Sequence, residues 1–180
     1  MNPSAKLPLT LPETEDDLRL TKREWPGFFP HNGTQRVALY SERLLVGYRW
    51  YDAKAVEPAF AFGHGLSYTS FALSKLSAAA GSVTVIVTNT GKLAGRAVPQ
   101  LYISFPKDAG EPPRQLRGFV KTAQLAAGEA EEIEFALRER DVSVWDAETH
   151  AWSKVRGEFG VLVGFSSRCP RALKASFRVE

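Results

Sequence analysis

From residue 68 onward, apolar and polar residues alternate with a period of two. Residues 82–89 place three valines on one side and two threonines on the other. Similar alternation recurs in residues 101–105, 132–137, 157–166 and 175–179. Each stretch is typical of a strand with one face in a core and the other in solvent. With residues 68–76 as a first strand, the pattern predicts an all-β sandwich of about seven strands, of fibronectin type III or immunoglobulin type, over residues 67–180.

Residues 1–66 follow no such pattern. Prolines interrupt every long helix or strand, and residues 6–11 are the only strand-like piece. A lone short strand is unstable, so we expect this piece to pair with a sheet that the chain does not supply. A free tail would be depleted in large aromatic residues, but this half contains Trp25, Phe28, Phe29, Tyr40, Trp50 and Tyr51. We therefore interpret residues 1–66 as an extended, largely irregular connector that lies on another surface.

Residues 49–71 are dense in aromatic residues, glycine and proline. They have neither helical nor strand periodicity, which predicts an ordered loop without a regular element. Within this loop, Asp52 lies beside Arg49, Trp50 and Tyr51, surroundings that could raise its pKa for acid or base chemistry. We favour an ion pair between Asp52 and an arginine, because no second carboxylate stands at a spacing that indicates a catalytic pair.

His64 lies between two glycines, where the backbone can approach another segment closely. A catalytic histidine needs a nucleophile or a metal, and neither His31 nor His150 falls in a ligand motif. We expect a structural hydrogen bond from His64.

Residues 145–152 are typical of a hairpin tip with a tryptophan on each arm, Trp145 and Trp152. Two tryptophans could form a platform on which a sugar stacks. Alternatively, they form a cross-strand aromatic pair that fixes the hairpin.

Composition excludes several classes of function. The net charge is +3 over 180 residues and the basic residues are scattered, so we expect no nucleic-acid partner. No apolar run reaches membrane-spanning length. The first twenty residues do not have the pattern of a signal peptide. The single cysteine, Cys169, offers no internal disulfide and no metal cluster. No phosphate-binding loop, nucleophile elbow or zinc spacing is present, and we expect no cofactor, no metal and no self-sufficient active site.

Several motifs resemble the C-terminal region of glycoside hydrolase family 3, which includes β-glucosidases and β-xylosidases. The strongest likeness lies in residues 46–52 (VGYRWYD) and 57–71 (EPAFAFGHGLSYTSF). Further similar segments are residues 3–12, 87–91, 100–103, 113–121 and 141–146. The resemblance implies that residues 1–66 are the end of an α/β sandwich domain plus an interdomain connector, and that residues 67–180 are a fibronectin type III-like domain.

The resemblance also implies where catalysis lies. Members of this family resemble one another in using an aspartate nucleophile from an N-terminal barrel and commonly a glutamate acid/base from the α/β sandwich domain. A retaining mechanism needs both carboxyl groups. This chain begins after both positions, so we expect an accessory role and no catalytic residue. Its expected partners are the catalytic domains of the same enzyme, with a β-glucoside or polysaccharide as a further candidate. The residues expected to dock between domains are Arg49, Tyr51, Asp52, Phe60, Phe62, His64 and Tyr68. The alternative is a stand-alone carbohydrate- or protein-binding module.

Overall fold

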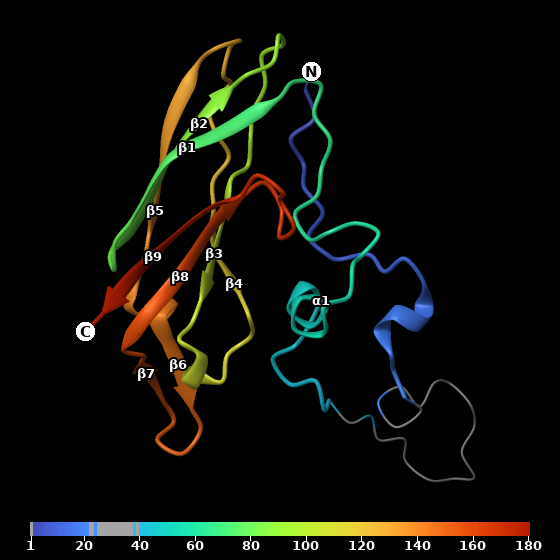
Figure 1. The fold of residues 1–180 in the computed structure, drawn as a ribbon, viewed down its shortest axis with the longest axis vertical. Coiled ribbons are helices and arrows are strands. Elements are labelled where there is room, and N and C mark those ends of the chain that lie inside the picture. Colours follow the sequence, from blue (N-terminus) through green and yellow to red (C-terminus); the bar gives the residue numbers. More distant parts are fainter. Residues whose placement is uncertain (1, 22–23, 25–37, 39) are drawn as a thin grey trace.

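The computed structural model describes residues 2–21, 24, 38 and 40–180. Two antiparallel sheets face each other in this part of the chain (Figure 1). One sheet has the order β1-β2-β5 and consists of β1 (Phe71–Ala78), β2 (Ser82–Asn89) and β5 (Ala130–Ala136). The other has the order β4-β3-β8-β9 and consists of β3 (Gln100–Ser104), β4 (Gln115–Phe119), β8 (Gly157–Gly164) and β9 (Leu173–Val179). The predicted all-β sandwich is confirmed.

The hydrophobic core lies between the two sheets and is built by the alternating positions. In β2 the three valines are fully buried, and Val85 lies opposite Ile133 of β5. The other sheet contributes residues such as Leu101 and Phe159, both fully buried. Burial of these side chains away from water is the main favourable contribution to the stability of the sandwich.

A separate hairpin extends from one end of the sandwich (Figure 1). It pairs β6 (Ser143–Asp146) with β7 (Ala151–Lys154), as the sequence predicted for this region. The sequence did not predict β4, in which Arg117 and Gly118 interrupt the alternation. The first strand also begins at Phe71 rather than at residue 68.

Four short helices complete the described elements: η1 (Glu15–Leu18), α1 (Tyr48–Lys54), η2 (Lys107–Ala109) and η3 (Glu139–Val142). The helix α1 shows that the prediction of residues 49–71 as a stretch without regular structure was wrong. It has only seven residues, between Gly47 with φ of 60° and Ala55 with φ of 53°. Two turns are too short to show a periodicity, and such a helix is stabilised by packing rather than by propensity.

The connector covers the outer face of the four-stranded sheet at β3. In β3, Leu101 and Ile103 face the core, while Gln100 and Tyr102 point outward and are still buried. The ring of Tyr48 in α1 lies 5.8 Å from that of Tyr102, in an edge-on contact. This explains why β3 is buried on both faces, unlike the half-buried strands of the other sheet.

Residues 6–11 form backbone hydrogen bonds within this chain, which corrects the expectation that they pair only with an absent sheet. The Leu7 N–H donates to the carbonyl of His64 at 2.8 Å, and the Gly63 N–H donates to the carbonyl of Leu7 at 2.8 Å. Leu11 and Phe60 form an isolated antiparallel bridge. The aromatic residues Trp25, Phe28 and Phe29, on which part of the connector interpretation rests, lie outside the described residues.

Strand β5 is an edge of the three-stranded sheet. Its inward residues Ile133 and Phe135 are buried, whereas Glu132 and Glu134 are exposed on the other face. The edge therefore has an apolar face toward the core and a negatively charged face toward solvent.

Candidate functional site

An ion-pair cluster fastens α1 to the sandwich. The Asp52 carboxylate accepts a hydrogen bond from Arg114 Nε at 2.6 Å and another from Arg114 Nη2 at 2.9 Å. Arg168 Nε lies 3.0 Å from Asp52 Oδ1, the oxygen that also accepts from Arg114 Nη2, and the same guanidinium bonds Glu57 at 3.0 Å. The Asp52 side chain is only 2% exposed. The ion pair that we favoured for Asp52 is present, and the second carboxylate of this cluster, Glu57, bonds Arg168 rather than Asp52.

Tyr48 contributes a second contact between α1 and the sheet. The Leu116 N–H of β4 donates to the Tyr48 hydroxyl at 2.7 Å. The Tyr48 ring also lies 4.9 Å from the ring of Phe62, so one side chain joins α1, β4 and the later connector. Sequence reasoning did not single out Tyr48, although it lies inside the motif at residues 46–52.

Gln100 connects the sheet to the glycine-rich part of the connector. Its Nε2 donates to the carbonyl of Gly63 at 3.3 Å and to that of Phe165 at 3.0 Å, and its Oε1 accepts from the Tyr102 hydroxyl. Burial raises the pKa of Tyr102, so its hydroxyl keeps the proton that it donates. Gly63 has φ of 81°, and a Cβ there would overlap the Gln100 amide. This position therefore requires glycine.

The seven predicted docking residues divide into covered and exposed ones. Tyr51 is 3% exposed, and its hydroxyl is buried without a hydrogen-bond partner among the described residues. Burial raises the pKa of this hydroxyl, and the negative charge of Asp17 raises it further. Phe60 and Tyr68 are 46% and 74% exposed. The remaining four, Arg49, Asp52, Phe62 and His64, are partly buried within this chain. Docking between domains stays a prediction for all seven.

The expected hydrogen bond of the His64 side chain is absent among the described residues. The imidazole instead lies 5.3 Å from the ring of Phe60. The backbone of His64 makes the structural contacts, since its N–H donates to Ala61 and its carbonyl accepts from Leu7.

The two tryptophans of the β6–β7 hairpin form a cross-strand pair, as one of the two interpretations predicted. Trp145 lies opposite Trp152, with ring centroids 5.6 Å apart and an angle of 67° between the rings. The Arg140 guanidinium lies 4.5 Å from the centroid of the Trp152 ring. The rings therefore share no flat platform, and sugar stacking on Trp145 and Trp152 stays a prediction.

The described part of the chain contains no group of three or more histidine, cysteine, aspartate or glutamate residues that could hold a metal ion. The same residues include no helix that is long and apolar enough to span a membrane.

Comparison with known proteins identifies the family. A protein-family model described as the fibronectin type III-like domain matches residues 97–167. The probable β-glucosidase G of Neosartorya fischeri is 36% identical over 205 residues, which cover 93% of this chain and 24% of that protein. The structure of the GH3 β-glucosidase of Bifidobacterium adolescentis has a TM-score of 0.81 at 33% identity and covers 98% of this chain and 26% of that one. The chain belongs to glycoside hydrolase family 3.

A further family 3 structure, β-glucosidase 3B of Thermotoga neapolitana, has a TM-score of 0.83 at 40% identity and covers 99% of this chain and 25% of that one. The likeness thus includes both the connector and the sandwich. The chain spans about a quarter of the length of the curated relatives that it matches. It corresponds to an accessory, C-terminal part of these β-glucosidases. The boundary between residues 66 and 67 stays a prediction.

Proposed function

We propose that this chain is a non-catalytic brace of a family 3 β-glucosidase, in which the sandwich holds the connector in a fixed shape and the connector docks onto the catalytic domains. The observation that carries the proposal is the two-sided connector. One side is fixed to the outer face of the four-stranded sheet through the buried Asp52 cluster. The other side exposes apolar side chains, namely Leu9, Leu11, Val46 and Phe60, which are 47%, 39%, 61% and 46% exposed.

The exposed apolar side chains favour a protein partner over solvent. Leu11 and Phe60 pair through their backbones, so their side chains lie in adjacent segments. Burial of such side chains contributes about 25 cal/mol for each Å² of apolar surface removed from water. The partner is a part of the same enzyme, because the relatives are about four times as long as the region that they share with this chain.

The test is a chimera. This chain replaces the matching quarter of β-glucosidase 3B of Thermotoga neapolitana. Two properties of the chimera are measured: its hydrolysis of an aryl β-glucoside and its thermal midpoint of unfolding. We expect the chimera to be active and this chain alone to be inactive. Hydrolysis by the chain alone would refute the proposed division of labour.

Surface variants of the chimera test the docking itself. Phe60→Asp places a charge on the proposed interface and is expected to lower both the thermal midpoint and activity. Leu93→Asp is the matched control, because Leu93 is similarly exposed, at 56%, but lies outside the connector. Equal effects of the two substitutions would contradict docking through the connector.

A further inference from the structure

The side chain of Lys6 is partly buried between two segments of the connector. Its Nζ donates to the carbonyl of Gly65 at 3.1 Å. The chain packs so closely here that a Cβ on Gly65 would lie 2.8 Å from Lys6 Cδ. Lys6 has no carboxylate within 4 Å among the described residues, where the ion pairs involve Arg114, Arg138 and Arg168. The amine is therefore held in place without a counter-ion.

A cavity of about 160 Å³ lies beside this amine. Lys6 and Gly65 both line it, and the rings of Phe71 and Phe165, 6.3 Å apart, with the side chain of Val98 form apolar parts of its wall. The described residues place no acidic side chain in this wall. The volume is below the range of roughly 300–1,000 Å³ that is usual for larger ligands. The cavity therefore suits a molecule of a few carbon atoms.

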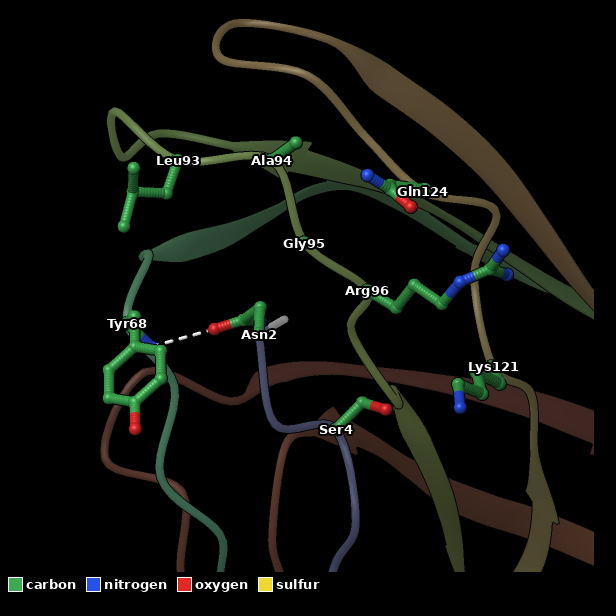
Figure 2. A pocket seen from close by; sticks show the side chains of 9 residues that line it. All are labelled: Asn2, Ser4, Tyr68, Leu93, Ala94, Gly95, Arg96, Lys121 and Gln124. Atoms are coloured by element: carbon green, nitrogen blue, oxygen red, sulfur yellow. Dashed lines mark hydrogen bonds between the residues drawn. The ribbon is translucent and has the colours of Figure 1, made fainter.

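Arg96 also lines this cavity, but its charge lies elsewhere. Figure 2 shows its side chain directed toward the loop of Lys121 and Gln124. Its Nη1 donates to the carbonyl of Thr122, in the same loop, at 3.0 Å. The Lys6 amine is therefore the ionisable group that the cavity offers to a ligand.

The surroundings of the Lys6 amine favour its neutral form. Burial lowers the pKa of this amine, because the charged form loses hydration and gains no carboxylate. A neutral amine can keep one N–H on the Gly65 carbonyl and still present its lone pair to a ligand. Lysines in such apolar surroundings are the ones that react with carbonyl compounds.

We propose that Lys6 forms an imine with a small aldehyde in this cavity. The Nζ lone pair attacks the aldehyde carbon, and the C–N bond forms as the carbonyl π electrons move onto oxygen. One proton passes from nitrogen to oxygen to give a carbinolamine. Loss of the second nitrogen proton with the hydroxyl group releases water and leaves a C=N bond. The aldehyde's carbon chain lies against Phe71, Val98 and Phe165, and the reaction does not depend on the proposed docking.

The test is competitive labelling of the complete 180-residue chain at about pH 7.5. The probe is a limiting amount of propanal with cyanoborohydride, which reduces each imine to a stable secondary amine, and peptide fragment spectra give the rate at each lysine. We expect Lys6 to be labelled at least about threefold faster than the exposed Lys92 and Lys107. In urea the preference should vanish with the cavity. Equal rates in the folded chain, or a preference that persists in urea, overturn the proposal.

A pair of serine variants locates the reactivity. Ser67→Asp places a carboxylate in the wall of the cavity, which favours the charged amine and is expected to slow labelling of Lys6 by about threefold. Ser70→Asp is the matched control, because it adds the same charge at a nearby exposed position outside the wall and should leave the rate unchanged. Both serines are exposed, so both variants report on a folded chain. An unchanged rate in Ser67→Asp, or an equal effect of Ser70→Asp, overturns the assignment to this cavity.

Discussion

Asp52 and Arg114 form a bidentate ion pair across 62 residues of sequence, with hydrogen bonds of 2.6 and 2.9 Å. The two parallel bonds fix the orientation of both groups, and Arg168 joins the same buried carboxylate to Glu57. Because Asp52 lies in α1 and both arginines belong to loops of the four-stranded sheet, the cluster sets the position of the connector on the sandwich.

Replacement of Asp52 by asparagine is expected to lower the free energy of unfolding by about 2–3 kcal/mol, because two partly buried arginines lose their carboxylate partner. Urea unfolding measures the change. Asp108→Asn is the matched control, since Asp108 is exposed and forms no ion pair among the described residues. A loss no larger than that of the control would show that the cluster does not stabilise the connector.

Gly63→Ala is expected to destabilise the chain by at least about 2 kcal/mol. The new Cβ would overlap the Gln100 amide, and alanine would have to adopt φ of 81°. Gly81→Ala provides the comparison, because its Cβ would meet no atom within 4 Å and its φ is not in the left-handed region. Chemical denaturation of both variants measures the effect, and similar midpoints would argue against close packing at Gly63.

The Asp141 carboxylate predicts a pH dependence of stability. Burial raises its pKa, but hydrogen bonds from the Arg138 side chain and backbone, with the charges of Arg138 and Arg117, outweigh burial and hold the pKa below its usual value. A carboxyl with a lower pKa in the folded state stabilises that state above the unfolded pKa of about 3.9, and this contribution is lost as the pH falls through the folded value.

Asp141→Asn is therefore expected to be less stable than the parent at pH 7, with a gap in thermal midpoint that narrows at pH 3. Asp108→Asn serves again as the control for removal of one negative charge. A gap of the same size at both pH values would mean that Asp141 stabilises the fold without its charge.

The pair of Trp145 and Trp152 is expected to show a coupling energy of about 1 kcal/mol in a double-mutant cycle with alanine. The edge-on contact at 5.6 Å is the physical reason. Denaturant unfolding of the two single variants and the double variant measures the coupling. Additive effects would show that the rings do not stabilise each other.

The same variants test the prediction of sugar stacking. If the hairpin binds a polysaccharide, affinity electrophoresis should retard the parent chain, and Trp145→Ala should lose more retardation than Trp152→Ala, because Arg140 already covers part of Trp152. No retardation of the parent would remove the alternative of a stand-alone carbohydrate-binding module that acts through this hairpin.

The sequence predicted the sandwich well because strand alternation is a local signal. Residues 82–89 show it fully, and β2 has these bounds. Strand β4 was missed because Arg117 and Gly118 break the alternation, and Arg117 is recruited instead to bond the carbonyl of Asp141 at 3.0 Å. Helix α1 was missed because its seven residues depend on contacts with a distant sheet.

The candidate site was less accessible from the sequence, because its contacts are long-range. The pattern around Asp52 indicated an ion pair with an arginine, but no local feature could select Arg114 and Arg168, which lie 62 and 116 positions away. The role of Gly63 likewise depends on Gln100, a residue of β3 whose outward side chain a strand pattern would place in solvent.

The outward glutamates of β5 have a consequence for how copies of this protein meet. An open strand edge offers unpaired backbone groups to which another strand can add. Glu132 and Glu134 would bring like charges together if two such edges approached each other. At high protein concentration, this repulsion opposes the growth of continuous sheets between molecules and favours solubility over aggregation.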